Sequence, residues 1–120
     1  MKTRPKVLSG KTIKLRTGCG SLYLTLNHDE EGNLFEIKMV LGKAGSCINS
    51  MLYKMAILWS YILQLGATKE DLIKLIKKHF LGISCDNSQK LEDGRMSSCS
   101  DMVGRAILEE LESGKEDKKA

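Results

Sequence analysis

Three segments of alternating apolar and polar residues within the first 41 positions constrain the fold more than any other feature. They are "KTIKLRTG" (11–18), "SLYLTLN" (21–27) and "LFEIKMVL" (34–41). Successive side chains of a strand point to opposite faces, so each alternation predicts a strand with one buried face. The inward set is Ile13, Leu15, Leu22, Leu24, Leu26, Phe35, Ile37, Met39 and Leu41, and the outward set is Lys14, Arg16, Tyr23, Thr25, Glu36 and Lys38. Short links favour an antiparallel meander, with a turn at 28–33 and positive φ at Gly32-Asn33.

Three helices are expected after the strands. In the first, over 47–65, Met51, Met55, Leu58, Ile62 and Leu65 form one stripe, which Leu52, Trp59 and Leu63 widen. So wide an apolar face predicts a helix buried over much of its circumference. Gly66 suits its end, and Thr68 with Asp71 suits the start of the second helix, which carries Leu72, Leu75, Ile76 and Phe80. The third begins near Ser98 or Ser100, with Val103, Ile107, Leu108 and Leu111 facing the core. The predicted fold is α+β, a three-stranded antiparallel meander followed by three helices packed on one face.

The positive charge is concentrated at the N-terminus. The chain has 120 residues and a net charge of +4, yet residues 1–16 hold six Lys/Arg and no acid, while residues 17–112 hold ten basic and thirteen acidic residues. We therefore expect a basic N-terminal arm at 1–10 and a frayed charged tail at 113–120. Nucleic-acid binding is not expected, because that function needs a basic face on the body itself. No segment is long and apolar enough to span a membrane or to resemble a signal peptide, which predicts a soluble, cytoplasmic protein.

Four motifs together resemble the TSCPD domain. They are "TGCGSLYLTLN" (17–27), "LGKAGSC" (41–47), "LGISC" (81–85) and "SSCSD" (97–101). That family is best known as a C-terminal module of adenosylcobalamin-dependent ribonucleotide reductases, and it also occurs as small stand-alone proteins. The resemblance implies a single TSCPD-like domain at 11–112. In the signature pentapeptide, Ser97 replaces threonine and Ser100 replaces proline, which is structurally mild because serine can cap a helix. The chain has no room for the reductase barrel and cofactor site, so we do not expect an enzyme.

The four cysteines fall on the family's cysteine positions. They are Cys19, Cys47, Cys85 and Cys99, spaced C-x27-C-x37-C-x13-C. They can form a tetrahedral zinc site, although the C-x2-C pair typical of zinc knuckles is absent. They can equally be structural thiols that pack as small hydrophobes. A redox pair is the third reading, with Cys47 and Cys99 the reactive residues, since both are expected at helix starts.

Two segments and one arginine are candidates for binding an anion. The segment "GKAGS" (42–46) lies between a strand and a helix start, where backbone N–H groups and the helix dipole attract negative charge. The loop at 86–98 is polar, and Arg105 can pair a phosphate or Asp101. The candidate ligand-binding residues are Gly42, Lys43, Gly45, Ser46, Asn87, Arg95, Ser98 and Arg105. The alternatives are a tight turn with a solvated lysine, a solvated loop and a surface ion pair.

Two functions remain open from the sequence. The first is a non-enzymatic, homo-oligomeric binding protein that holds an anionic nucleotide-like ligand. One use of such a protein would be to sequester a cyclic nucleotide signal, as phage sponge proteins do. The family's link to nucleotide metabolism suggests this ligand class. The second is a zinc-binding or thiol-redox accessory module whose partner is a ribonucleotide reductase subunit.

Overall fold

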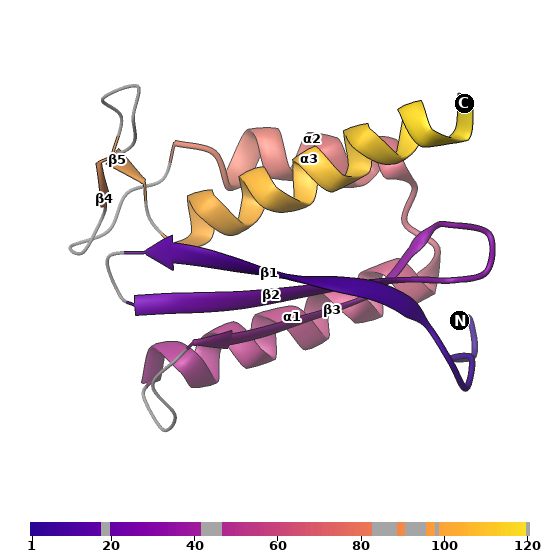
Figure 1. Ribbon diagram of the computed structural model, residues 1–120, viewed down its shortest axis with the longest axis horizontal. Coiled ribbons are helices and arrows are strands. Elements are labelled where there is room, and N and C mark those ends of the chain that lie inside the picture. The colour runs from indigo at the N-terminus through magenta and orange to yellow at the C-terminus, as the bar shows by residue number, and fades with distance from the viewer. Residues whose placement is uncertain (18–19, 42–46, 83–88, 91–95, 98, 120) are drawn as a thin grey trace. The chain divides into compact units, whose positions relative to one another are not determined.

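The computed structural model of the chain forms two compact units (Figure 1). It describes residues 1–17, 20–41, 47–82, 89–90, 96–97 and 99–119, with the backbone alone at 47–48, 89–90, 96–97, 99 and 114–119. The first unit comprises residues 1–15 and 20–68, and the second comprises 16–19 and 69–120. In the described residues, a three-stranded antiparallel sheet is followed by three α-helices. The predicted α+β class, with its meander and three helices, is confirmed.

The sheet has the order β1-β2-β3, in which β1 is Ser9–Thr17, β2 is Gly20–His28 and β3 is Leu34–Leu41. The register of β2 and β3 places Leu22, Leu24 and Leu26 opposite Leu41, Met39 and Ile37. All six side chains are buried, so the alternation predicted the inward face correctly. At the turn, the carboxylate of Asp29 accepts hydrogen bonds from the N–H groups of Glu31 and Asn33. Gly32 has the expected positive φ of 81°, whereas Asn33 does not.

The first helix, α1 (Cys47–Leu65), packs against β3 along a narrow stripe. The buried residues are Leu52, Ala56, Trp59 and Leu63. The stripe expected from the sequence is wrong, because Met51 is 72% exposed and Leu58 is 64% exposed. The expectation that the helix is buried over much of its circumference is therefore corrected to burial along a single face. The helix ends as predicted at Gly66, whose φ is 103°.

Two polar side chains of α1 bind the outer edge of β3, the terminal strand of the sheet. The hydroxyl of Ser60 accepts the Ile37 N–H at 2.9 Å and lies 3.1 Å from the Ile37 carbonyl oxygen. The amide oxygen of Asn49 accepts the Leu41 N–H at 2.9 Å. An edge strand otherwise presents unpaired backbone groups to any other strand. The helix therefore satisfies part of this edge and is fixed to it.

The outward face of the sheet carries a polar cluster around Glu36. Its carboxylate accepts hydrogen bonds from Arg4 Nε at 2.8 Å and from Asn27 Nδ2 at 2.9 Å, and Lys38 Nζ lies 3.9 Å away. Glu36 points outward as predicted, yet the residue is buried and not exposed to solvent. The reason is that the N-terminal arm folds back over it. The arm is also held at Lys2, whose N–H donates to the Gln64 carbonyl at 2.9 Å.

The second unit is built on α2 (Lys69–His79) and α3 (Cys99–Lys119), which pack against each other. A short antiparallel pair, β4 (Gln89–Lys90) and β5 (Met96–Ser97), lies between them in the chain. Gly104 of α3 faces α2 so closely that a Cβ there would lie 2.7 Å from the Phe80 Cβ. The expected core residues Leu72, Ile76, Val103, Ile107 and Leu111 are buried. The helix continues to Lys119, through the segment expected to be a frayed tail.

We predict that the bond between the arm and Glu36 stabilises the fold only above acidic pH. The pKa of Glu36 lies below its ordinary value of 4.5, chiefly because Arg4 donates a hydrogen bond to the carboxylate, with further help from Asn27 and Lys38. A depressed folded-state pKa gives stability that is present above the unfolded pKa and is lost as the pH falls through the folded pKa. Arg4→Gln should therefore lower the urea midpoint at neutral pH, and the difference from wild type should close toward about pH 3.

The matched control is Arg16→Gln, which removes an exposed arginine of β1. This variant should change the midpoint little at either pH. A difference between Arg4→Gln and wild type that persists undiminished at acidic pH would show that the arm is not held through the Glu36 carboxylate.

Candidate functional site

A buried carboxylate organises the start of α3. Asp101 is 1% exposed although it lies in the first turn of the helix. One oxygen accepts the N–H of Gly82 at 2.8 Å, and the other accepts the Nε of Arg105 at 2.9 Å. Gly82 follows α2 and has a φ of 84°. Asp101 thus joins the segment after α2 to the first two turns of α3, entirely within the second unit.

Arg105 is held by this carboxylate through one nitrogen. Its side chain is 33% exposed. Its Nε is bonded to Asp101, and its two terminal nitrogens have no bond to any residue that the structure describes. A guanidinium whose stem is fixed in this way loses less conformational entropy when it binds a carboxylate or phosphate. The ion pair expected from the sequence is confirmed, but it is not a surface pair, because one partner is buried.

One side of Arg105 is acidic. A shallow surface depression of about 460 Å³ is lined by Arg105, Leu108, Glu109, Glu112 and Ser113. Two carboxylates in so small a space repel an anion, because like charges cost free energy even near the surface. The acidic side chains therefore disfavour an anion on this side of Arg105, whereas the helix dipole is positive toward the N-terminal end of α3.

A sequence model of the TSCPD domain matches residues 1–111 of this 120-residue chain. The chain belongs to the TSCPD domain family. No curated protein and no solved structure matches the chain significantly. The resemblance expected from the four motifs is confirmed, and the family match spans nearly the whole of the given chain.

The last residue of the TSCPD signature segment has a structural role in this chain. The segment "SSCSD" ends at Asp101, whose carboxylate bonds Gly82 and Arg105. The segment begins in β5 with Ser97, and Cys99 is the first residue of α3. The signature therefore spans a strand end, a helix start and the buried carboxylate that holds this helix start in place.

Most of the predicted site residues lie outside the described part of the chain. These are Gly42, Lys43, Gly45, Ser46, Asn87, Arg95 and Ser98, together with Cys19 and Cys85. For Cys47 and Cys99 the backbone is described, and each is the first residue of a helix, α1 and α3 respectively, as predicted. Their side chains are not described. Of the predicted ligand-binding set, only Arg105 is placed.

The described residues also bear on metal and membrane binding. Within them, no three His, Cys, Asp or Glu side chains gather closely enough to hold a metal ion, and the four cysteine side chains all fall outside this search. The predicted zinc site therefore stays a prediction. No helix in the described ranges has the length and apolar character that a bilayer crossing requires.

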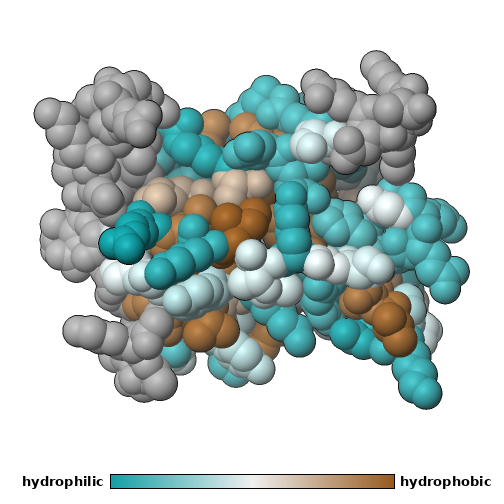
Figure 2. Space-filling view, viewed as in Figure 1, coloured by the Kyte–Doolittle hydropathy of each residue, from teal (hydrophilic) through white to brown (hydrophobic). Residues whose placement is uncertain are grey.

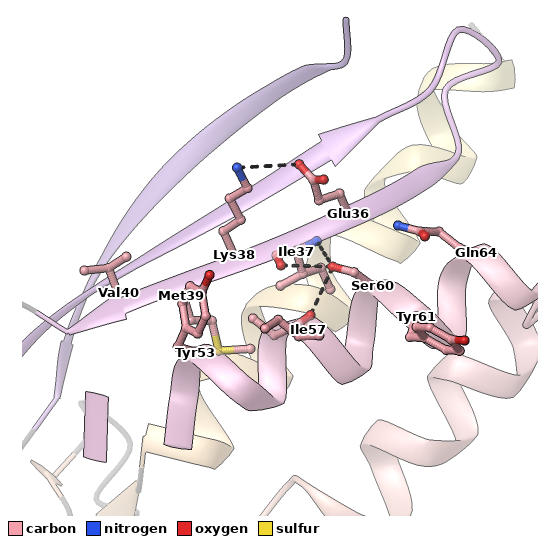
Figure 3. A pocket seen from close by; sticks show the side chains of 11 residues that line it. Glu36, Ile37, Lys38, Met39, Val40, Tyr53, Ile57, Ser60, Tyr61 and Gln64 are labelled. Atoms are coloured by element: carbon pink, nitrogen blue, oxygen red, sulfur yellow. Dashed lines mark hydrogen bonds and ion pairs between the residues drawn. The ribbon is translucent and has the colours of Figure 1, made fainter. Parts of the chain in front are cut away.

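Sequence reasoning missed a groove beside the edge of β3. Its volume is about 320 Å³, and it lies entirely within the first unit (Figure 3). One wall is β3 from Glu36 to Val40, and the other is the α1 row of Tyr53, Ile57 and Tyr61. The signal that could have found it is Ser60, a polar residue within the otherwise apolar run 55–63 of α1, which marks the side of the helix that meets the strand.

We predict that Asp101 is required for stability. Asp101→Ala should cost about 2–3 kcal/mol, because it leaves the Gly82 N–H without its acceptor and removes a charge-assisted bond. Asp101→Asn should cost less, since the amide oxygen can still accept from Gly82. Urea denaturation followed by circular dichroism measures both. The matched control is Glu109→Ala, which removes an exposed carboxylate of the same helix and should stay within about 0.5 kcal/mol of wild type.

Arg105→Ala should also destabilise the fold. Removing the guanidinium leaves the Asp101 carboxylate buried without its charged partner, which is strongly unfavourable. Equal stability of Asp101→Ala and Glu109→Ala would contradict the structural role of the signature aspartate.

Proposed function

We propose that this TSCPD domain is a non-enzymatic binding protein for an anionic, nucleotide-like ligand, and that Arg105 contacts the anionic group. The observation that carries this proposal is the bond from the buried Asp101 to Arg105 Nε, at 2.9 Å. It orients the guanidinium in advance, and the terminal nitrogens, which bond none of the residues that the structure describes, would bind the ligand. Arginine in such a geometry is the preferred side chain for bidentate recognition of phosphate.

The position of Arg105 along α3 supports the same proposal. It lies one turn after Asp101, near the N-terminal end of the helix, where the dipole adds to its positive charge. The sequence also predicts that Lys43 and the segment "GKAGS" contribute to anion binding. The TSCPD family's association with ribonucleotide reduction suggests nucleotides as the ligand class. Sequestration of a cyclic nucleotide signal is one use that such a domain would have.

We predict that calorimetry will detect binding of nucleotides and that Arg105→Lys will weaken it at least about tenfold, or about 1.4 kcal/mol. Lysine preserves a positive charge beside Asp101 but lacks the planar fork that binds phosphate through two parallel bonds. The experiment titrates a panel of nucleoside monophosphates, triphosphates and cyclic nucleotides, with inorganic phosphate included. Lys43→Ala is tested in parallel and should also weaken binding.

The matched control is Arg16→Lys, the same substitution at an exposed arginine of β1, which should bind like wild type. The thermal midpoint of each variant shows whether the fold is preserved. No heat from wild type with any nucleotide, or equal affinities of wild type and Arg105→Lys, would refute the proposal.

A second function is favoured by the two cysteines that begin helices. Cys47 is the first residue of α1 and Cys99 is the first residue of α3. The N-terminus of a helix stabilises a thiolate, which is the form that binds zinc and attacks disulfides. We therefore keep, as the alternative proposal, a zinc-binding or thiol-redox accessory module that acts with a ribonucleotide reductase subunit. Four cysteine ligands are a common set for structural zinc.

Native mass spectrometry separates the two proposals, and we predict a co-purified nucleotide without zinc. One zinc ion per chain, released by a chelator together with a drop in thermal stability, would instead support the accessory role, because metal binding and folding are coupled. Rapid alkylation of two thiols in a metal-free sample would support the redox form of that role. The fourfold variant with serine at 19, 47, 85 and 99 provides the control, since it should lose both zinc and thiol signals.

A further inference from the structure

The surface of the first unit has an apolar face that is larger than a monomer needs. Apolar surface, brown in Figure 2, reaches solvent between polar side chains. Most of the exposed large hydrophobic residues belong to one helix and the strand beside it. We call this set the α1 face, and its members are Val40, Met51, Tyr53, Ile57, Leu58, Tyr61, Ile62 and Leu65.

The helical period places these residues on one continuous side of α1. Met51, Leu58, Ile62 and Leu65 form a row that follows the spacing of one helix face. Tyr53, Ile57 and Tyr61 form the adjoining row, which lines the groove together with Val40. Both rows lie opposite the buried stripe that contains Ala56 and Trp59.

The α1 face is almost uncharged. In the 19 residues of α1, Lys54 is the only charged side chain. Lys54 lies between the two rows of the α1 face, and its ammonium is 5.9 Å from the centre of the Tyr53 ring, where the ring partly compensates its charge. Depletion of charge with enrichment of Tyr and Met is typical of the core of a protein interface.

We propose that the α1 face is the interface of a symmetric homodimer, in which α1 packs against α1 of a second copy. The exposed area of the α1 face is large enough for such a dimer interface. The face has eight side chains, each about half exposed and each with a full accessible surface of about 200 Å². Together they expose on the order of 800 Å² of accessible surface to solvent. A stable interface of standard size buries about 800 Å² per partner, and the largest apolar patch of a typical monomer is about 300–600 Å².

The shape of the face also fits a second copy. An isologous interface pairs one patch with itself, so the patch must carry both a projection and a complementary depression. Here the row of Met51, Leu58 and Leu65 projects from the helix, and the groove of about 320 Å³ lies beside it. A nearly neutral face has little charge with which to select a foreign partner, and it meets little repulsion from its own copy.

The edge of β3 disfavours the other common way of forming a dimer, which is to join two sheets. The N–H group of Ile37 is already bonded to Ser60 (Figure 3). The N–H group of Leu41 is likewise bonded to Asn49. A strand added at this edge would have to displace both side chains of α1. The contact is therefore made by helix faces and not by strand pairing. A membrane surface is also a poorer match, because helices that lie on membranes carry many Lys and Arg residues on their polar side.

The test is the mass of the full chain in solution, measured by sedimentation velocity and light scattering over a range of concentrations. Wild type should sediment with twice the chain mass of 13.4 kDa. Leu58→Glu should raise the dimer dissociation constant at least about 100-fold, because two carboxylates would be brought into an apolar contact. Leu58 is 64% exposed, so the substitution should leave the circular dichroism spectrum of the monomer unchanged.

Two further variants keep the result interpretable. Val7→Glu replaces another exposed hydrophobic residue, outside the α1 face, and should remain dimeric. Tyr61→Ser removes a groove side chain without adding charge and should weaken the dimer as well. A wild-type monomer at all concentrations, or a dimer that Leu58→Glu leaves intact, would overturn the proposal. A monomer that floats with anionic lipid vesicles would also overturn it and would assign the face to a membrane surface.

Discussion

The hydrogen bonds between α1 and the outer edge of β3 determine which surfaces the first unit presents. Ser60 and Asn49 are eleven residues apart, about three turns, so they lie on the same side of the helix. Both bind backbone N–H groups of β3, at Ile37 and Leu41. Leaving a buried backbone group unpaired costs about 1–3 kcal/mol, so the two bonds resist rotation of the helix about its axis. The orientation of α1 then determines which of its residues form the buried stripe, which line the groove and which form the exposed apolar face.

This constraint explains why the sequence predicted the strands better than the helix. In the strands one phase of the alternation is far more apolar than the other, so the inward residues of β2 and β3 were identified correctly. In α1 nearly every position is apolar, and two stripes compete, one through Met51 and Leu58 and one through Leu52 and Trp59. Hydrophobicity alone cannot choose between them. The choice depends on small and polar residues, Ala56 and Ser60, which permit close approach to β3 and bind its edge.

The polar contacts show the same limit of sequence reasoning. The outward direction of Glu36 follows from the alternation, but its burial depends on Arg4, which is 32 residues away in the chain. The pairing of Arg105 with Asp101 follows from their spacing of four residues on a helix. The burial of Asp101 does not, because it depends on Gly82, 19 residues earlier. Contacts between residues so far apart in the chain form only when it folds, so no local sequence pattern predicts them.

The buried position of Asp101 changes how the signature segment should be interpreted. A signature residue can contact a ligand, or it can hold the backbone that contacts the ligand. Asp101 holds the backbone at the start of α3, since it accepts the Gly82 N–H and bonds Arg105. Ser100 replaces the proline of the family signature at the first turn of the helix, and the helix still begins at Cys99. A mild change at one signature position is tolerated because the buried carboxylate at the next position anchors the helix start. Loss of ligand binding in an Asp101 variant would therefore report a displaced Arg105, whereas loss of binding in Arg105→Lys with the fold intact would report the contact itself.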